Sequence, residues 1–323
     1  FMLRGIVFGH RDFKIVLDAI KNRKKFAVMS GIKPTGEFHL GTLMTAREII
    51  YFQQQGAFAS YCIADIEAYE DNAIPYEKSE KYAVGNVADL LALGFDRSRG
   101  YVYRQSTEPR VKDLSFVFGR AVTLATMNAI YGGRHIGLYM SALIQAGDIL
   151  MPQLEDFGGP KPTVVPVGVD QDAHLRLCRD LAQKFAKYRF VSPSSTYHKI
   201  MRGLNGSPKM SKRDPMSYFT LQEKPGRIAK KVSNALTGGR ATEGEQRQLG
   251  GVPEQCCVYE VCLFHFRTDD NDLLRMYEDC VSGRVLCGEC KSRAIEVILK
   301  FITNHQEKRE RLIDDARQTL KMA

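Results

Sequence analysis

Apolar residues in the first part of the chain fall into short runs that predict buried strands. The runs cover residues 25–30, 57–64, 101–103 and 162–169. Between the first two, apolar side chains in residues 43–50 recur at the spacing of one helix face. Pro166 weakens the fourth strand, because proline cannot donate a hydrogen bond within a sheet. Strands that alternate with helices predict an α/β fold, a doubly wound, Rossmann-like parallel sheet with helices on both faces.

The pattern changes after about residue 205, where strand-like runs no longer occur. Gly283 interrupts a helical pattern, and residues 292–320 form one long, charged, amphipathic pattern. We therefore expect two domains. Residues 1–205 would form the Rossmann-like domain, with an N-terminal segment and an inserted connective region. Residues 206–323 would form a mostly α-helical domain.

Composition narrows the classes of protein. With 323 residues, 44% of them hydrophobic, the chain can build a large core. It has no uninterrupted apolar stretch of membrane-spanning length, and Phe1–His10 lacks the apolar segment of a signal peptide, so we expect a cytoplasmic protein without a membrane partner. The net charge of +9 favours a polyanionic partner such as RNA. A solvated basic surface would explain the same charge.

Residues 30–42 connect a predicted strand to a predicted helix, which is where α/β proteins bind ligands. The N-terminus of a helix presents free N–H groups to phosphate. Gly41 would let a nucleotide approach the backbone, and His39 could donate a hydrogen bond to a phosphate oxygen. Taken alone, this segment is more commonly a surface histidine in a glycine-containing turn.

Residues 207–213 place Lys209 and Lys212 three positions apart on a predicted loop. Two such lysines could reach the same phosphates and stabilise the charge that develops in phosphoryl transfer. A solvated basic loop is the alternative for an isolated pair of this kind.

Together, the two segments resemble the HIGH and KMSKS motifs of class I aminoacyl-tRNA synthetases. The motifs read here His39-Leu40-Gly41-Thr42 and Lys209-Met210-Ser211-Lys212-Arg213. Thr42 replaces the second histidine of the first motif, and Arg213 replaces the final serine of the second. The resemblance implies a ligase that uses ATP and Mg²⁺ to form an aminoacyl-adenylate and passes it to tRNA. It implies catalytic roles for His39, Lys209 and Lys212.

Nearly the whole chain resembles the tryptophan–tRNA ligases of that class. Residues 8–12, 237–240 and 249–251 look like segments of these enzymes, and residues 167–172 resemble their G-x-D-Q loop. The resemblance implies a homodimer and a helical domain that binds the tRNA anticodon. It implies ATP contacts from Lys33, Gly41, Thr42, Gly168, Asp170, Lys209, Met210, Ser211 and Lys212.

Residues 145–150 resemble the run in which an acid accepts the indole N–H of tryptophan, a role that would fall to Asp148. Capping of a helix by Asp148 is the local alternative. The resemblance also implies that Glu67, with Gln145 and Gln171, binds the amino group of the substrate. Because tyrosine–tRNA ligases use an acid near the same position, tyrosine remains an alternative substrate. More distant alternatives are a class I-like nucleotidyltransferase and a non-enzymatic RNA-binding protein.

Six of the eight cysteines fall within residues 256–290. Cys257, Cys280, Cys287 and Cys290 have the spacing C-x22-C-x6-C-x2-C. Four thiolates are suitable ligands for zinc or an iron–sulfur cluster, although reduced core thiols are also possible. The spacing resembles that of tryptophan–tRNA ligases that carry a [4Fe–4S] cluster, and it implies this cluster here, with Zn²⁺ as the alternative. Cys256 and Cys262 would then be core residues.

Overall fold

The computed structural model of the chain describes residues 1–211 and 214–321. Its strands are β1 (Val7–Arg11), β2 (Ala27–Ile32), β3 (Phe58–Ile63), β4 (Gly100–Arg104), β5 (Thr163–Gly168) and β6 (Ser194–His198). Its helices are α1 (Phe13–Lys21), α2 (Leu40–Gln54), α3 (Asp65–Asn72), α4 (Tyr76–Ala92), α5 (Pro109–Gly119), α6 (Leu124–Tyr131), α7 (Ile136–Leu150), α8 (Asp172–Lys184), α9 (Pro225–Ser233), α10 (Glu243–Leu249), α11 (Cys257–Val261), α12 (Asp270–Val281), α13 (Cys287–Arg311) and α14 (Ile313–Thr319).

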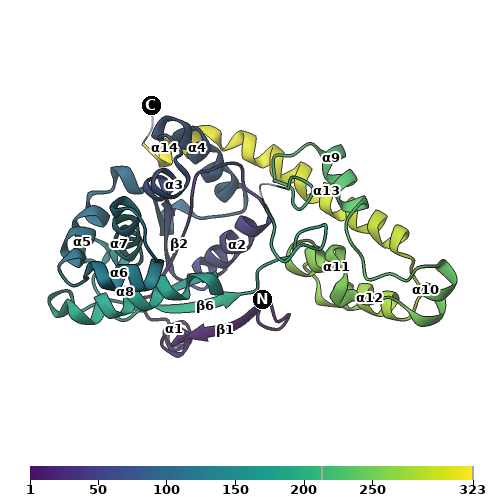
Figure 1. Ribbon diagram of the computed structural model, residues 1–323, viewed down its shortest axis with the longest axis horizontal. Coiled ribbons are helices and arrows are strands. Elements are labelled where there is room, and N and C mark those ends of the chain that lie inside the picture. Colours follow the sequence, from purple (N-terminus) through teal and green to yellow (C-terminus); the bar gives the residue numbers. More distant parts are fainter. Residues whose placement is uncertain (212–213, 322–323) are drawn as a thin grey trace. The chain divides into compact units, whose positions relative to one another are not determined.

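The strands within the described residues form one six-stranded sheet in the order β1-β6-β5-β2-β3-β4 (Figure 1). Strand β1 is antiparallel to β6, and the other neighbouring strands are parallel. The predicted α/β class and its mostly parallel sheet are therefore confirmed. Pro166 lies within β5 as predicted, opposite Thr196 of β6.

The hydrophobic pattern did not predict β1 and β6. Strand β6 reads Ser-Ser-Thr-Tyr-His, yet all five of its residues are buried. Because β6 lies between β1 and β5, its polar side chains are enclosed by the fold without any apolar run in the sequence. Strand β1 is an edge strand with alternating exposure, and its Phe8 side chain is 53% exposed.

The chain divides into two compact units. The first unit consists of Phe1–Ile6, Phe38–Met44 and Ile200–Glu310. The second consists of Val7–Glu37, Thr45–Lys199 and Arg311–Ala323 and contains the sheet. The functional boundary after residue 205 stays a prediction. The single long helix expected over residues 292–320 is wrong, because the chain has two helices there, α13 and α14, which meet at Leu312.

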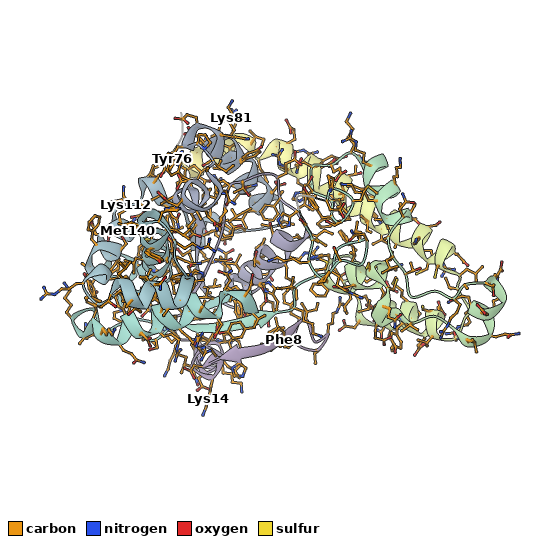
Figure 2. The ribbon with its side chains drawn as sticks, in the orientation of Figure 1. Phe8, Lys14, Tyr76, Lys81, Lys112 and Met140 are labelled. Atoms are coloured by element: carbon orange, nitrogen blue, oxygen red, sulfur yellow. The ribbon has the colours of Figure 1, made fainter. Side chains whose placement is uncertain are left out.

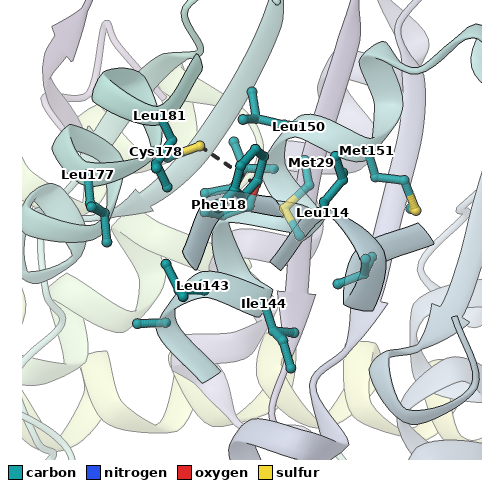
Figure 3. Close-up of a cluster of buried hydrophobic side chains, with 14 of the residues drawn as sticks. Met29, Leu114, Phe118, Leu143, Ile144, Leu150, Met151, Leu177, Cys178 and Leu181 are labelled. Carbon is teal, nitrogen blue, oxygen red and sulfur yellow. Dashed lines mark hydrogen bonds between the residues drawn. The ribbon is translucent and has the colours of Figure 1, made fainter. Parts of the chain in front are cut away.

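The core of the second unit lies where α7 packs against α5, α8 and the strands β2 and β5. Figure 3 shows the Phe118 ring in this cluster, near Leu114, Leu150 and Met29. The Cys178 thiol lies 3.8 Å from the carbonyl oxygen of Ala146 and joins α8 to α7. Helix α7 is therefore held in place on several sides, which fixes the position of the side chains that it carries.

The surface of this unit carries charged side chains. Lys14 on α1 and Lys81 on α4 are exposed and point into solvent (Figure 2). Part of the positive charge of the chain therefore lies on side chains exposed to solvent, as the alternative explanation of the net charge expects. Among residues 1–211 and 214–321, no helix is both long enough and apolar enough to cross a membrane.

Candidate functional site

His39 lies at the N-terminal end of α2, in the first unit. Its Nδ1 atom accepts a hydrogen bond from the backbone N–H of Gly41 at 3.1 Å, and its Nε2 atom lies 3.3 Å from the Thr42 hydroxyl oxygen. A Cβ atom at position 41 would lie 3.1 Å from the imidazole, so glycine leaves the space that the ring occupies. A neutral imidazole that accepts at Nδ1 carries its proton at Nε2. The Nε2–H of His39 therefore faces the Thr42 hydroxyl, and the predicted phosphate contact of His39 stays a prediction.

The segment around His39 is joined to the chain that follows the lysine loop. Thr220 forms an antiparallel bridge with His39, and the Leu221 N–H donates to the Phe38 carbonyl oxygen at 2.8 Å. The Tyr218 ring lies edge-on to the imidazole, with 6.1 Å between centroids. The first signature segment and the chain directly after the second therefore pack together within the first unit.

The base of the lysine loop is closed by side-chain hydrogen bonds. The Asn205 side-chain amide donates to the Asp214 carboxylate at 2.6 Å. The hydroxyl of fully buried Ser217 accepts from the Ser211 N–H at 3.0 Å and donates to the Asp214 carbonyl oxygen at 2.7 Å. These bonds define where the loop leaves the core and where it returns.

The predicted phosphate-binding residues lie between these two ends. Lys209 is exposed, and Met210 and Ser211 are partly buried. Lys212 lies outside the described residues. An exposed lysine on a loop with a closed base fits a cation that meets a bound phosphate, and the catalytic role of Lys209 and Lys212 stays a prediction.

The other predicted nucleotide-binding residues lie in the second unit. The Lys33 ammonium is 2.7 Å from the Asp71 carboxylate and 3.9 Å from that of Glu67. Gly168 ends β5, and a Cβ atom there would come within 2.5 Å of Asp170 Oδ1. The Asp170 carboxylate therefore lies over the carboxyl end of a parallel strand, where α/β sheets bind ligands. ATP contacts by Lys33, Gly168 and Asp170 stay predictions.

Asp148 is buried in the last turn of α7, with 1% of its surface exposed. The Tyr103 hydroxyl donates to one carboxylate oxygen at 2.8 Å, and the Gln105 side-chain amide donates to the other at 2.6 Å. The alternative that Asp148 caps a helix is wrong, because the carboxylate is bound by side chains from strand β4 and the turn that follows it. Such a buried acceptor fits the predicted contact with an N–H group.

Glu67, in the first turn of α3, belongs to the same hydrogen-bond network. The Gln105 side-chain amide donates to Glu67 Oε1 at 3.0 Å, and its oxygen accepts from the Glu67 backbone N–H at 3.3 Å. Burial raises the pKa of Glu67, and the Lys33 ammonium opposes that shift. The structure therefore brings the two predicted substrate acids together through Gln105, which the sequence pattern did not single out.

The two predicted substrate glutamines lie in the same unit. Gln145 is partly buried and precedes Asp148 by three residues on α7, so both project from the same side of that helix. Gln171 ends a 3₁₀ turn, Val169–Gln171, directly before α8. Their predicted contact with the amino group of a substrate stays a prediction.

A second polar pair, Tyr131 and His174, was also missed from the sequence. The Tyr131 hydroxyl is 3.0 Å from His174 Nδ1. Burial, together with the Lys33 charge, lowers the pKa of His174 to about 4, so the imidazole is neutral at physiological pH. Charge interactions connect Tyr131 to Glu67 and His174 to Lys33, which places this pair beside the predicted substrate acids.

The Asp148 carboxyl makes the stability of the fold depend on pH. Burial raises its pKa to about 8, from an ordinary value of 3.8. Between these values the folded chain binds a proton that the unfolded chain releases, so the contribution of Asp148 is present at acid pH and is lost as the pH rises toward about 8. We expect Asp148→Asn to lose less unfolding free energy than the parent between about pH 5 and pH 8. Its amide oxygen can face Gln105, and its NH₂ group can donate to the Tyr103 hydroxyl.

Urea unfolding of the parent and the variant at both pH values measures this difference. Because Asp148 and Glu67 interact, the difference includes the effect of the Asp148 charge on the titration of Glu67. Equal losses in parent and variant would show that Asp148 is not the titrating group.

The cysteine-rich region of the first unit surrounds a cavity of about 270 Å³. Its lining residues are Thr237, Gly238, Cys256, Val258, Arg267, Asp272, Arg275, Met276, Asp279, Cys280, Val285, Cys287, Cys290, Lys291 and Arg293. Three of the four predicted ligands, Cys280, Cys287 and Cys290, are among them. Within the described part of the chain, no three or more His, Cys, Asp or Glu side chains are arranged to hold a single metal ion.

The adjacent cysteines 256 and 257 lie in different surroundings. Cys256 lines the cavity, although the sequence assigned it to the core. Cys257, the fourth predicted ligand, is not among the lining residues and is 1% exposed. Burial, together with the nearby thiols of Cys256, Cys280 and Cys287, raises the pKa of the Cys290 thiol to about 12. Cys256, Cys280, Cys287 and Cys290 are therefore the cysteines that line the cavity.

Two glycines leave room for these thiols. A Cβ atom at Gly239 would lie 2.5 Å from the Cys287 sulfur, and one at Gly251 would lie 2.8 Å from the Cys280 sulfur. Any larger residue at either position would have to displace a cysteine side chain. The backbone around the cavity is therefore fitted closely to the sulfur atoms.

Comparisons with known proteins agree with this fold. Residues 21–303 match the model of the family described as tRNA synthetases class I (W and Y). The chain is 41% identical to the tryptophan–tRNA ligase of Methanocaldococcus jannaschii over 316 residues, which are 96% of this chain and 85% of that protein.

Solved structures are similar as well. The crystal structure of tryptophanyl-tRNA synthetase from the archaeon Aeropyrum pernix K1 has a TM-score of 0.94 and 42% identity, over 99% of this chain and 88% of that one. The structure of tryptophanyl-tRNA synthetase from Encephalitozoon cuniculi bound to tryptophan has a TM-score of 0.89 and 27% identity, over 99% of this chain and 88% of that one.

Proposed function

Because the chain belongs to the class I tRNA synthetases of the tryptophan and tyrosine family, we propose that it attaches L-tryptophan to its cognate tRNA. The reaction consumes ATP, forms a tryptophanyl-adenylate and releases pyrophosphate. The observation that carries the proposal is the similarity to tryptophan–tRNA ligases, at 41% identity over 96% of the chain. The same similarity supports tryptophan over tyrosine as the substrate. It also disfavours a nucleotidyltransferase or a non-enzymatic RNA-binding protein.

The chemistry places few covalent demands on the protein. The carboxylate of the amino acid attacks the α-phosphate of ATP, and pyrophosphate leaves, so catalysis depends on positioning and on charge stabilisation. The Nε2–H of His39 would donate to a phosphate oxygen in place of the Thr42 hydroxyl, and the ammonium groups of Lys209 and Lys212 would meet the charge on the leaving group. Magnesium accompanies the triphosphate and supplies further positive charge to it.

The amino-acid site would lie around the network in the second unit. Asp148 is a buried acceptor for the indole N–H, and Glu67, with Gln145 and Gln171, would bind the amino group. An acceptor of this kind discriminates against an apolar ring such as that of phenylalanine, which would leave it unpaired.

Pyrophosphate exchange with each amino acid tested singly measures the proposed activation step. We expect exchange to be fastest with tryptophan and lowest with an amino acid such as phenylalanine, whose ring has no donor for the buried acceptor. Exchange that is fastest with tyrosine, or that occurs with no amino acid while the protein is folded, would contradict the proposal.

We further propose that the cysteines around the cavity bind a [4Fe–4S] cluster, with Zn²⁺ as the alternative. The donor set fits, because four thiolates bind either group. The larger group fits better. Zinc would require all four sulfur atoms within about 2.3 Å of one point, whereas these thiols line a cavity of about 270 Å³. Arg267 lines the same cavity, where its charge would offset the negative charge of thiolates that hold a cluster.

The adjacent cysteines provide a matched test of the ligand set. Anaerobically purified parent protein should contain about four iron atoms per chain and show the absorption of a thiolate-bound cluster. We expect Cys256→Ser to lower the iron content by at least about half and Cys257→Ser to leave it unchanged, because only the first side chain faces the cavity. If Cys257→Ser loses iron and Cys256→Ser does not, the ligands are the four cysteines predicted from spacing, with Cys257 among them. A content of one zinc atom and no iron would show a zinc site in place of the cluster. If the protein contains neither metal, the cysteines are ordinary core residues.

The remaining proposals concern assembly and location. We propose a cytoplasmic homodimer whose helical part, after residue 205, binds the tRNA anticodon. Exposed apolar side chains in the segment between β4 and β5 support a second copy as the partner, because Phe116, Leu124 and Ile136 are 76%, 69% and 74% exposed. Sedimentation equilibrium that gives the mass of one chain at micromolar concentration would exclude the dimer.

A further inference from the structure

Gln105 occupies an unusual place in the second unit, because one side-chain amide joins two buried carboxylates. Its nitrogen is 2.6 Å from an Asp148 oxygen and 3.0 Å from a Glu67 oxygen, and its side chain is completely buried. An amide nitrogen carries two hydrogens, so each carboxylate receives one of them. The amide oxygen accepts from the Glu67 backbone N–H at 3.3 Å.

This arrangement fixes the orientation of the amide. A flipped Gln105 would turn its oxygen toward two acceptors and its NH₂ group toward a backbone N–H, and all of these contacts would be lost. The turn that carries Gln105 is itself tied down. The Ser106 N–H donates to buried Asp65 at 2.9 Å, and the Lys112 ammonium donates to the Ser106 carbonyl oxygen at 3.0 Å.

We infer that Gln105 is a positioning residue for the amino acid: it sets the spacing of the Asp148 and Glu67 carboxylates and makes binding of the ring N–H and of the α-amino group interdependent. The inference rests on the proposed function, which assigns the first carboxylate to the indole and the second to the amino group. A planar amide with both donors in use has little freedom to follow one carboxylate without moving the other. A substrate group that binds one carboxylate and fixes its position therefore also fixes the position of the other carboxylate.

Tyr103 provides the matched control. Its hydroxyl donates to Asp148 at 2.8 Å and makes no hydrogen bond to Glu67. Tyr103→Phe therefore removes one donor from the indole acid and leaves the bridge intact. Gln105→Met keeps the length and much of the volume of the side chain but removes both donors.

A cycle of four ligands measures the interdependence by calorimetry. The ligands are tryptophan, tryptophan methylated on the indole nitrogen, the analogue without the α-amino group, and the analogue with both changes. In the parent and in Tyr103→Phe, we expect the effects of the two changes on Kd to deviate from independence by about fivefold or more. In Gln105→Met the effects should become independent, and KM for tryptophan should rise about tenfold with little change in kcat.

Gln105→Leu serves as a second variant if the methionine variant does not fold, because it also removes both donors and adds no charge beside the two acids, and it should show the same loss of interdependence. Independent effects in the parent, or parental coupling in either folded Gln105 variant, would overturn the inference. Neither result would affect the proposed function, which fails only if the parent does not bind tryptophan or if methylation of its indole nitrogen leaves Kd unchanged.

Discussion

Replacing Lys209 or Lys212 by alanine should lower the rate of tryptophan activation and leave tryptophan binding nearly unchanged. The reason is that these ammonium groups would meet charge that develops mainly in the transition state. Loss of one such contact raises the activation free energy by about 2–4 kcal/mol, which lowers the rate roughly 30- to 1,000-fold. Pyrophosphate exchange under saturating substrates gives the rate, and equilibrium dialysis without ATP gives the affinity for tryptophan.

Lys300→Ala is the control for a general loss of positive charge. Lys300 is an exposed lysine on α13, and its removal should leave both measurements at the parental values. If Lys209→Ala and Lys212→Ala both exchange pyrophosphate at the parental rate, the loop has no catalytic role.

Replacing Asp148 by alanine should weaken the discrimination between tryptophan and phenylalanine. The variant removes a buried acceptor, and a hydrogen bond to such a group contributes about 1.5–3 kcal/mol, so kcat/KM for tryptophan should fall roughly 10- to 100-fold. Activity with phenylalanine should change far less, because its ring has no N–H to pair. Relative kcat/KM for the two amino acids is the measurement.

Two comparisons distinguish a loss of the indole contact from a general loss of stability in Asp148→Ala. Tryptophan methylated on the indole nitrogen should be discriminated against by the parent and accepted by the variant almost as well as tryptophan. Asp113→Ala, an exposed acid on α5, should keep the parental ratio. An unchanged ratio in Asp148→Ala would exclude Asp148 as the acceptor for the indole.

The sequence predicted strands where burial requires a continuous apolar run. It did not predict strands whose burial depends on neighbouring elements. Strands β2, β3, β4 and β5 were predicted because their runs are apolar. Strand β6 was not, because Ser194–His198 is buried by its neighbours despite a polar sequence. The long helical pattern near the C-terminus carries no glycine or proline, so the break at Leu312 has no local signal.

The candidate site was predicted to a similar extent. Asp148 could be singled out from the run around it, but its partners Tyr103 and Gln105 lie 45 and 43 residues away in the sequence. Such contacts depend on the folded path of the chain and not on any local pattern. Cysteine spacing identified the region of the cavity, yet it could not decide between two adjacent residues, because Cys256 and Cys257 project from neighbouring backbone positions in different directions.

The central claim is that this protein esterifies tRNA with tryptophan, and charging tests it most directly. Purified protein would be incubated with ATP, Mg²⁺, unfractionated tRNA and an equal mixture of all amino acids, and the ester on the terminal adenosine would be identified by mass spectrometry. The account predicts tryptophanyl-adenosine, on tRNA whose anticodon reads the tryptophan codon. Tyrosyl-adenosine, or no ester from protein that is folded and binds ATP, would contradict it.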